Sequence, residues 1–294
     1  MKLLNLTAAI LSVISLVAGQ QQVTTSSATS GIISQYGSSF KNAGGSVLSD
    51  KVNVYVVFYG NWSSVESQQE QSIFLKFVDN ISSSSWFNLL HQYNDNNGKS
   101  VTGPLNLAAA VNDAGSKGLS LNDTEIHKQI ILGAVNSGYL STSNGLDSNG
   151  VYVIMGASDV TDSQFCNTNC GYNSYSDQFQ YMFIGYPGIC SSKCMPSINM
   201  NASPNNSPAM DAAITIFSHE IQDILTDPRN NAWQIQGNGT IIEVADFCSS
   251  EGTSQEQFGN VTQGQAGSYN LEVEGSKYLV QTIFDLSSQT CSLG

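Results

Sequence analysis

Basic side chains are scarce in this sequence, which has ten Lys plus Arg against 23 Asp plus Glu in 294 residues and a formal net charge of −13. Proteins that bind nucleic acid or anionic membranes present clusters of basic side chains. The composition therefore argues against both partners. Long apolar runs are also missing beyond the N-terminus, so we expect no membrane span.

The N-terminus has the features of a secretory signal over residues 1–19. Lys2 supplies a positive charge, an apolar stretch follows to Val17, and small residues end at Gly19. This stretch is too short and too polar to span a membrane well. We therefore expect a secreted protein of the extracellular medium or cell wall. Residues 20–50 are rich in Ser, Thr and Gly and are predicted to form a loose leader before a single domain over residues 51–294.

The cysteines support export, because their even number suits an oxidising compartment. Two Cys-x-x-x-Cys pairs could bind zinc, but disulfide bonds are the favoured interpretation in an exported chain. The sequence does not choose among the possible pairings; we favour bonds between the two pairs and a bond between the last two cysteines. The six residues are Cys166, Cys170, Cys190, Cys194, Cys248 and Cys291.

Asn-x-Ser/Thr sequons are also frequent, as expected of a secreted glycoprotein. Since such triplets also arise by chance in a chain rich in Asn and Ser, only the whole set carries weight. The predicted glycosylation sites are Asn61, Asn80, Asn122, Asn201, Asn205, Asn238 and Asn260.

Strand and helix patterns alternate early in the chain, and loops dominate late. Short β-branched and aromatic runs predict strands, and apolar residues at helical spacing predict helices. This order favours an α/β fold, a mixed sheet flanked by helices. The predicted strands are 51–59, 150–158, 181–185 and 277–284, and the main predicted helices are 66–81, 122–138 and 207–226.

The helix over 207–226 is the most informative segment. Ser207-Pro208 is a good helix start and Asp227-Pro228 a stop. Its apolar residues predict burial on almost all sides. His219 and Asp223, four residues apart, lie on one face, and Glu220 is turned about 100° away from His219.

This layout resembles the His-Glu-x-x-His helix of the thermolysin-like zinc peptidases, the gluzincins, with the second histidine replaced by Asp223. Glu243 follows at the distance of their third ligand, and Asp246 comes shortly after. We therefore predict a zincin-like site in which His219, Asp223 and Glu243 hold one divalent metal, zinc, manganese or calcium. Glu220 is the predicted catalytic base, and Asp246 is expected to orient the imidazole from outside the ligand set.

Three blocks in order resemble the Exordium, or phosphate-induced protein 1, family. They are Val-Asn-Val-Tyr through Tyr-Gly-x-Trp over 52–62, Asn-Gly-Val-Tyr through Cys-x-x-x-Cys-Gly over 149–171, and Ser-His-Glu through Glu-x-Ala-Asp-x-Cys over 218–248. The resemblance implies a secreted or cell-wall protein linked to growth, of unsettled biochemical activity. Plant members often carry an aromatic residue and a histidine where this chain has Tyr172-Asn173.

Two functions follow from these patterns. One is a secreted metal-dependent hydrolase, a peptidase acting on a peptide or cell-wall component. The other is a non-catalytic extracellular growth or signalling protein, in which the same residues hold a structural ion or form an internal polar network. The remaining histidines, His91 and His127, are expected to play no part, and His127 falls on the polar face of its predicted helix.

Overall fold

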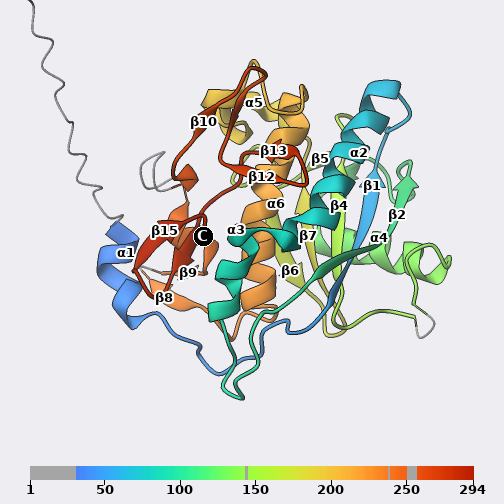
Figure 1. Cartoon of the computed structure of the whole chain (residues 1–294). Helices are drawn as coiled ribbons and strands as arrows, with labels where there is room; N and C mark the ends of the chain where they lie inside the picture. The colour runs from blue at the N-terminus through green and yellow to red at the C-terminus, as the bar shows by residue number, and fades with distance from the viewer. Residues whose placement is uncertain (1–30, 143–144, 238, 250–256) are drawn as a thin grey trace, which may run out of the picture.

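The structure, a computed structural model, describes residues 31–142, 145–237, 239–249 and 257–294. The predicted signal over 1–19 lies outside these residues. A five-stranded sheet in the order β2-β1-β4-β7-β6 forms the centre (Figure 1). The first four strands run parallel and β6 is antiparallel to β7. Their bounds are β1 Val52–Tyr59, β2 Leu105–Asp113, β4 Val151–Gly156, β6 Gly171–Tyr175 and β7 Gln180–Ile184.

Helices cover both faces of this sheet. Tyr172 and Asn173 are neighbours on β6 and point to opposite faces. Tyr172 contacts His127 on α4, Thr124–Asn136, whereas Asn173 bonds to Glu220 on α6, Pro208–Thr226. The third long helix, α2 (Val65–Asn80), packs on α6 through Phe74. The predicted α/β class, a mixed sheet flanked by helices, is therefore confirmed.

The central strands match the prediction because their sequences are apolar almost throughout. β4 is buried at every position and β1 at all but one, as expected of strands covered on both faces. The expected strands at 51–59, 150–158 and 181–185 correspond to β1, β4 and β7. β2 and β6 went unpredicted. Both lie at the edges of the sheet and are half-exposed; β6 lacks a continuous apolar run, and the apolar run of β2 over 107–111 is mostly alanine.

The predicted strand over 277–284 is wrong. The chain forms two short strands here, β13 Ser276–Tyr278 and β14 Ile283–Asp285, in separate hairpins. Between them Val280 donates its N–H to Asn270 Oδ1 and Gln281 donates its own to Ser218 Oγ, at 2.9 Å each. Side chains thus take the place of a partner strand.

The remaining elements are short. They are α1 Gly31–Tyr36, η1 Gly37–Ser39, η2 Ile81–Ser83, α3 Ser85–Asn88, η3 Leu89–Gln92, β3 Ser120–Leu121, β5 Thr161–Asp162, η4 Pro187–Cys190, α5 Ser191–Cys194, η5 Ser197–Asn199, β8 Ile235–Gly237, β9 Thr240–Ile242, η6 Ala245–Cys248, β10 Thr262–Gln263, β11 Ser268–Tyr269, β12 Leu271–Val273 and β15 Thr290–Ser292.

Residues 31–50, the described part of the predicted leader, pack onto the C-terminal half of the chain. The ring of Phe40 lies 4.4 Å from that of Phe247 and 5.5 Å from that of Trp233 between centroids. Val47 and Leu48 are also buried. This part of the leader is therefore packed rather than loose.

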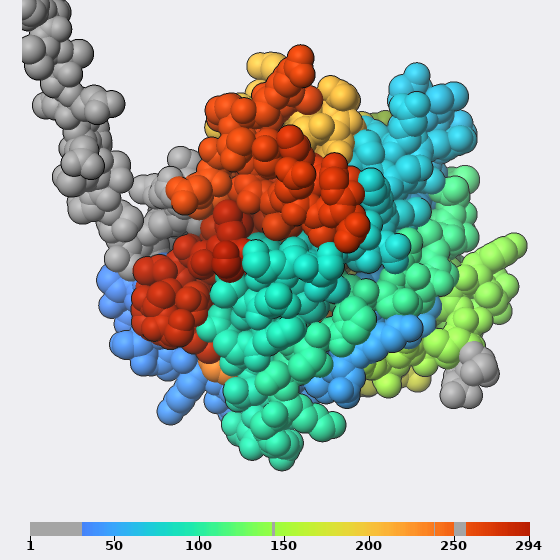
Figure 2. All heavy atoms as spheres, viewed as in Figure 1, coloured from blue at the N-terminus to red at the C-terminus, as the bar shows by residue number. Residues whose placement is uncertain are grey.

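The C-terminal segment closes over α3, and Figure 2 shows the two in contact. Trp86 donates its indole N–H to the carbonyl of Gln281 at 2.6 Å, and the Tyr93 hydroxyl donates to the carbonyl of Phe284. These bonds join residues almost 200 positions apart in the chain. They hold the late, loop-rich part of the chain against its first half.

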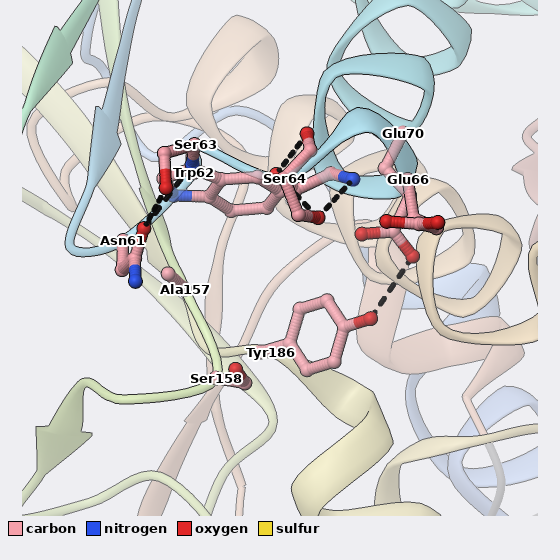
Figure 3. Close-up of a pocket in the computed structure, with 10 residues that line it drawn as sticks. Asn61, Trp62, Ser63, Ser64, Glu66, Glu70, Ala157, Ser158 and Tyr186 are labelled. Atoms are coloured by element: carbon pink, nitrogen blue, oxygen red, sulfur yellow. Dashed lines mark hydrogen bonds between the residues drawn. The ribbon is translucent and has the colours of Figure 1, made fainter.

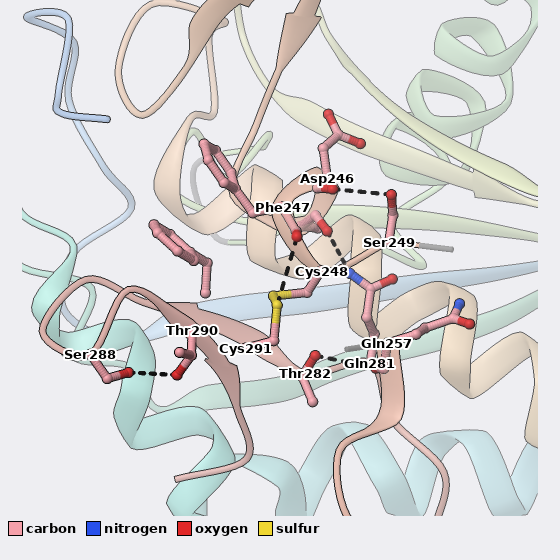
Figure 4. The surroundings of a disulfide bond; sticks show 12 residues. Asp246, Phe247, Cys248, Ser249, Gln257, Gln281, Thr282, Ser288, Thr290 and Cys291 are labelled. Carbon is pink, nitrogen blue, oxygen red and sulfur yellow. Dashed lines mark hydrogen bonds between the residues drawn. A yellow bond between two sulfur atoms is a disulfide. The ribbon is translucent and has the colours of Figure 1, made fainter. Parts of the chain in front are cut away.

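Three disulfide bonds join Cys166 to Cys190, Cys170 to Cys194 and Cys248 to Cys291. The favoured bonds between the two close pairs and between the last two cysteines are confirmed, and the structure decides which cysteines of the two pairs are joined. Figure 4 shows the last bond, which ties η6 to β15. Within the described residues, no helix combines the length and the apolar character that a membrane crossing needs.

The sequons differ in how their asparagines are placed. Asn61, Asn122, Asn201 and Asn260 are exposed, Asn80 and Asn205 are half-buried, and Asn238 lies outside the described residues. The Asn205 amide nitrogen, the atom that glycosylation would modify, donates to Asp211 Oδ1 at 2.6 Å and to the carbonyl of Lys277 at 3.0 Å. We therefore expect Asn205 to be a poorer acceptor than the exposed sites.

Candidate functional site

Helix α6 lies between the sheet and the C-terminal segments, as its orange ribbon shows in Figure 1. All its residues are buried except Pro208, Ile216 and His219. It contacts β6 and β7 on one side, and on the other Thr215 donates to the carbonyl of Leu279 at 2.7 Å. The burial expected from its apolar residues is thus observed. Away from the first turn, the exposed part of the helix is a narrow strip that includes Ile216 and His219.

This strip forms one wall of a cavity of about 610 Å³. Five α6 residues line the wall, and their helical spacing places them on one face; they are Ala212, Thr215, Ile216, His219 and Glu220. Facing segments come from 168–171, 193–198, 246–249 and the C-terminal region. The polar side chains that these segments contribute include Lys193, Asp246, Gln257 and Gln281.

His219 is held from both ring nitrogens. Nδ1 lies 3.1 Å from Gln281 Oε1. Nε2 lies 3.5 Å from Asp223 Oδ2 and 3.9 Å from Asp246 Oδ1. The structure therefore brings Asp223 and Asp246 to the same ring nitrogen, and the contact to the other nitrogen, expected of Asp246, is made by Gln281.

The other two predicted ligands are engaged differently. Asp223 Oδ1 accepts the N–H of Ala245 at 2.8 Å. Glu243 Oε1 is buried and has no hydrogen-bond partner among the residues that the structure describes. In the same described part, no group of three or more His, Cys, Asp or Glu side chains is placed to hold a metal ion. The predicted set of His219, Asp223 and Glu243 is thus not assembled as a metal site there.

Burial controls the protonation of the carboxyl groups. Desolvation, reinforced by the charge of Asp223, raises the pKa of Glu243 to about 10. Desolvation and the charge of Asp246 raise the pKa of Asp223 well above its usual range, against the bond from Ala245. Both groups therefore favour the neutral form in this structure, as buried carboxyl groups without a compensating charge do.

His219 and Glu220 line the cavity, unlike Asp223 and Glu243, so a ligand in the cavity could reach them. Burial lowers the pKa of His219, but the charges of Glu220 and Asp246 and the bond to Gln281 outweigh it, so the pKa is raised. Burial raises the pKa of Glu220, opposed by His219 and by Asn173, whose amide donates to Glu220 Oε2 at 3.3 Å. A carboxyl group and an imidazole that lie side by side, each with a raised pKa, can exchange a proton.

Sequence reasoning missed Gln281 and Asn173. Gln281 lay inside a segment that we predicted as a strand, and the polar pair Gln281-Thr282 within that apolar run was the available signal. Asn173 lies on β6, an unpredicted edge strand. In the sequence, Asn173 differed from plant members, which often have a histidine there. That difference did not show that Asn173 would face Glu220.

The expectation for His127 was wrong in one respect: it is fully buried. Its Nε2 lies 3.4 Å from Asp162 Oδ2, which also accepts the Tyr172 hydroxyl at 3.1 Å. This cluster lies across the sheet from α6, so it belongs to the packing of α4 rather than to the cavity. His91, which follows an apolar turn in the sequence, is exposed.

A conserved region described for phosphate-induced protein 1 matches residues 40–293. The chain belongs to the phosphate-induced protein 1 family. Among relatives of the family, EXORDIUM-like 3 of Arabidopsis thaliana is 26% identical over 84% of this chain and 81% of its own length. PHOSPHATE-INDUCED 1 of Nicotiana tabacum is 23% identical over 84% of this chain and 86% of its own. No solved structure matches the chain. Family and disulfide bonds together fit an extracellular protein.

Proposed function

We propose that the chain is a secreted member of its family that binds an extracellular peptide segment in the cavity beside α6. The observation that carries this proposal is that the cavity is lined by both apolar and charged side chains. Ile198, Ile216 and Phe258 give it apolar surface, and its charged or titratable side chains are Lys193, His219, Glu220 and Asp246. Binding sites for small molecules and peptides combine an apolar lining with a few fixed polar groups in this way.

The charges define the peptide further. Asp246 and Glu220 are acceptors. His219 Nδ1 is bonded to Gln281, and its Nε2 lies within 4 Å of two aspartates. The Lys193 ammonium already donates to the carbonyl of Cys166 at 2.8 Å. A ligand with an apolar side chain beside a lysine or arginine would fill the apolar part of the cavity and pair with the acidic part. The strongly acidic chain would also attract such a basic ligand over a longer range.

The test is selection from a displayed peptide library by the purified, secreted protein, followed by affinity measurement on the selected peptides. We expect peptides with adjacent apolar and basic residues. Asp246→Asn should weaken their binding about tenfold, as loss of one charged partner does. Glu272→Gln, which removes an exposed carboxylate on β12, is the matched control and should bind as wild type. Equal binding by Asp246→Asn, or no selection at all, would refute the proposal.

A zincin-like metallohydrolase of the peptidase type is the second candidate. Oxygens of Asp223 and Asp246 lie 3.5 and 3.9 Å from His219 Nε2, and Asp246 lines the cavity together with Glu220 and His219, which favours it. In that case His219 and Asp223, with Glu243 or Asp246, would hold zinc, manganese or calcium, and the ion would supply a Lewis acid. Glu220 would be the base, acting on a peptide or a cell-wall component.

Elemental analysis and a peptide-library digest separate the two candidates. The metallohydrolase requires a stoichiometric ion that His219→Ala loses, and cleavage that Glu220→Gln abolishes. The binding function requires neither, and its peptides should be recovered intact. Cleavage that is lost in Glu220→Gln would therefore replace the binding proposal with the catalytic one.

A further inference from the structure

A second cavity, of about 280 Å³, lies at the carboxyl ends of the parallel strands (Figure 3). Its walls come from residues 61–64 after β1, residues 157–158 after β4, the first turns of α2, and Tyr186 after β7. It therefore gathers side chains from three strand ends and one helix start. The residues of the His219 cavity do not contribute to it.

The order of the strands explains why a cavity forms here. β1 leads through α2 to β2 on one side, and β4 pairs on the other side of β1. The segments that follow β1 and β4 therefore diverge and leave a crevice outside the strand ends, where open α/β sheets bind ligands. The segments after β1 and β4 are joined where Asp159 Oδ1 accepts the N–H of Asn61 at 3.0 Å.

The lining is rich in hydroxyl groups and has no positive side chain among its described residues. It contains two rings, Trp62 and Tyr186, and two carboxylates, Glu66 and Glu70. The hydroxyl groups, which can both donate and accept hydrogen bonds, belong to Ser63, Ser64, Ser67 and Ser158.

Glu70 is fixed in place by two donors. The hydroxyl of Tyr186 donates to its Oε1 at 2.9 Å, and the hydroxyl of Ser207 donates to the same oxygen at 2.8 Å. Burial and the charge of Glu70 raise the pKa of Tyr186, so the phenol stays a donor. An ordered acceptor thus lies beside an aromatic ring, as the dashed bond in Figure 3 shows.

We propose that this cavity binds the uncharged end of a saccharide, one sugar ring deep. Sugar hydroxyls donate and accept at once, which matches a wall of serine hydroxyls and carboxylates, and the C–H face of a sugar ring packs on aromatic side chains. The absence of basic groups from the lining disfavours phosphate and carboxylate ligands. The volume lies just below that of sites for drug-sized molecules, about 300–1,000 Å³.

The exposed sequon at Asn61 forms part of the rim. A glycan on Asn61 would start at the mouth of the cavity and would compete with a free sugar. The measurement is therefore made on secreted protein before and after enzymatic removal of N-linked glycans. Binding that appears or strengthens after removal supports the proposal, because it shows that the attached sugar occupied the site.

The experiment is calorimetric titration with neutral mono- and disaccharides, with choline and inorganic phosphate as alternative probes. We expect weak, roughly millimolar binding of one sugar type, reduced at least about tenfold by Ser158→Leu, which fills the cavity from an exposed position. Glu66→Gln should also weaken it, whereas the exposed control Glu272→Gln and the other-cavity variant His219→Ala should leave it unchanged. No sugar binding, equal binding by Ser158→Leu, or binding of choline or phosphate instead would each overturn the proposal.

Discussion

Gln281 joins the C-terminal segment to His219. Its Oε1 lies 3.1 Å from His219 Nδ1, and its amide nitrogen donates to the carbonyl of Ala245 at 2.7 Å. One buried side chain thus connects α6 with η6 and sets the orientation of the imidazole. Because the ring is held at Nδ1, Nε2 faces the two aspartates of the site.

Replacing Gln281 with leucine should loosen this arrangement. The change removes both bonds and leaves the Ala245 carbonyl without its donor, which costs about 1–3 kcal/mol of unfolding free energy. It should also weaken binding of the selected peptides. Urea unfolding and peptide affinity measure the two effects. Gln178→Leu, at an exposed position, is the control; equal effects of the two variants would show that the Gln281 bonds do not matter.

Glu243 should make the protein less stable as pH rises. Its pKa is raised to about 10 in the folded state, so the folded state holds a proton that the unfolded chain releases above pH 4.5 or so. Stability is then full below the unfolded pKa and falls by up to about 1.4 kcal/mol per pH unit between the two values. Glu243→Gln should remove this contribution.

The measurement for Glu243 is urea unfolding of wild type and Glu243→Gln at pH 5 and pH 8. The variant should gain relative stability at pH 8, because it carries no proton to lose. Glu272→Gln controls for the loss of one carboxylate at an exposed position. Parallel pH dependences for wild type and Glu243→Gln would contradict the assignment of a buried neutral acid.

Two glycines offer a matched pair of substitutions. A Cβ on Gly171 would lie 2.6 Å from Ile216 Cγ2 and 3.0 Å from the carbonyl oxygen of Phe183, whereas a Cβ on Gly133 meets nothing within 4 Å. Gly171→Ala should therefore separate β6 from α6 and cost about 1–3 kcal/mol. Gly133→Ala, inside α4, should stabilise by up to about 1 kcal/mol. Thermal unfolding distinguishes them, and changes of the same sign would be inconsistent with the packing described.

Removing the Cys248–Cys291 bond should destabilise the fold and the site together. The bond closes a loop with a sequence separation of 43 residues, and losing such a cross-link typically costs about 2–5 kcal/mol. Cys248 follows Asp246 in η6, so peptide binding should weaken as well. The double variant Cys248→Ser/Cys291→Ser is compared with wild type by urea unfolding and by peptide affinity. Unchanged binding would show that η6 is held by its packing alone.

Local sequence patterns determined the central strands and the course of α6. Apolar residues repeat over 52–59 and 151–156, and Pro208 and Asp227-Pro228 mark the two ends of the helix. Such signals are local: the run of apolar residues indicates a buried strand, and the residues at each end mark where a helix starts and stops. The cysteine spacing suggested bonds between the two close pairs, but only the structure decides that Cys166 pairs with Cys190 and Cys170 with Cys194.

Helical spacing had placed Asp223 beside His219, but which further groups reach each ring nitrogen was decided by the tertiary structure. Asp246 rather than Glu243 approaches Nε2, and Gln281 holds Nδ1. Motif spacing places residues along a chain, but which oxygen reaches the ring depends on how η6 and the C-terminal segment pack on α6. That packing depends on contacts between distant parts of the chain, such as the bond from Trp86 to Gln281, which no local pattern encodes.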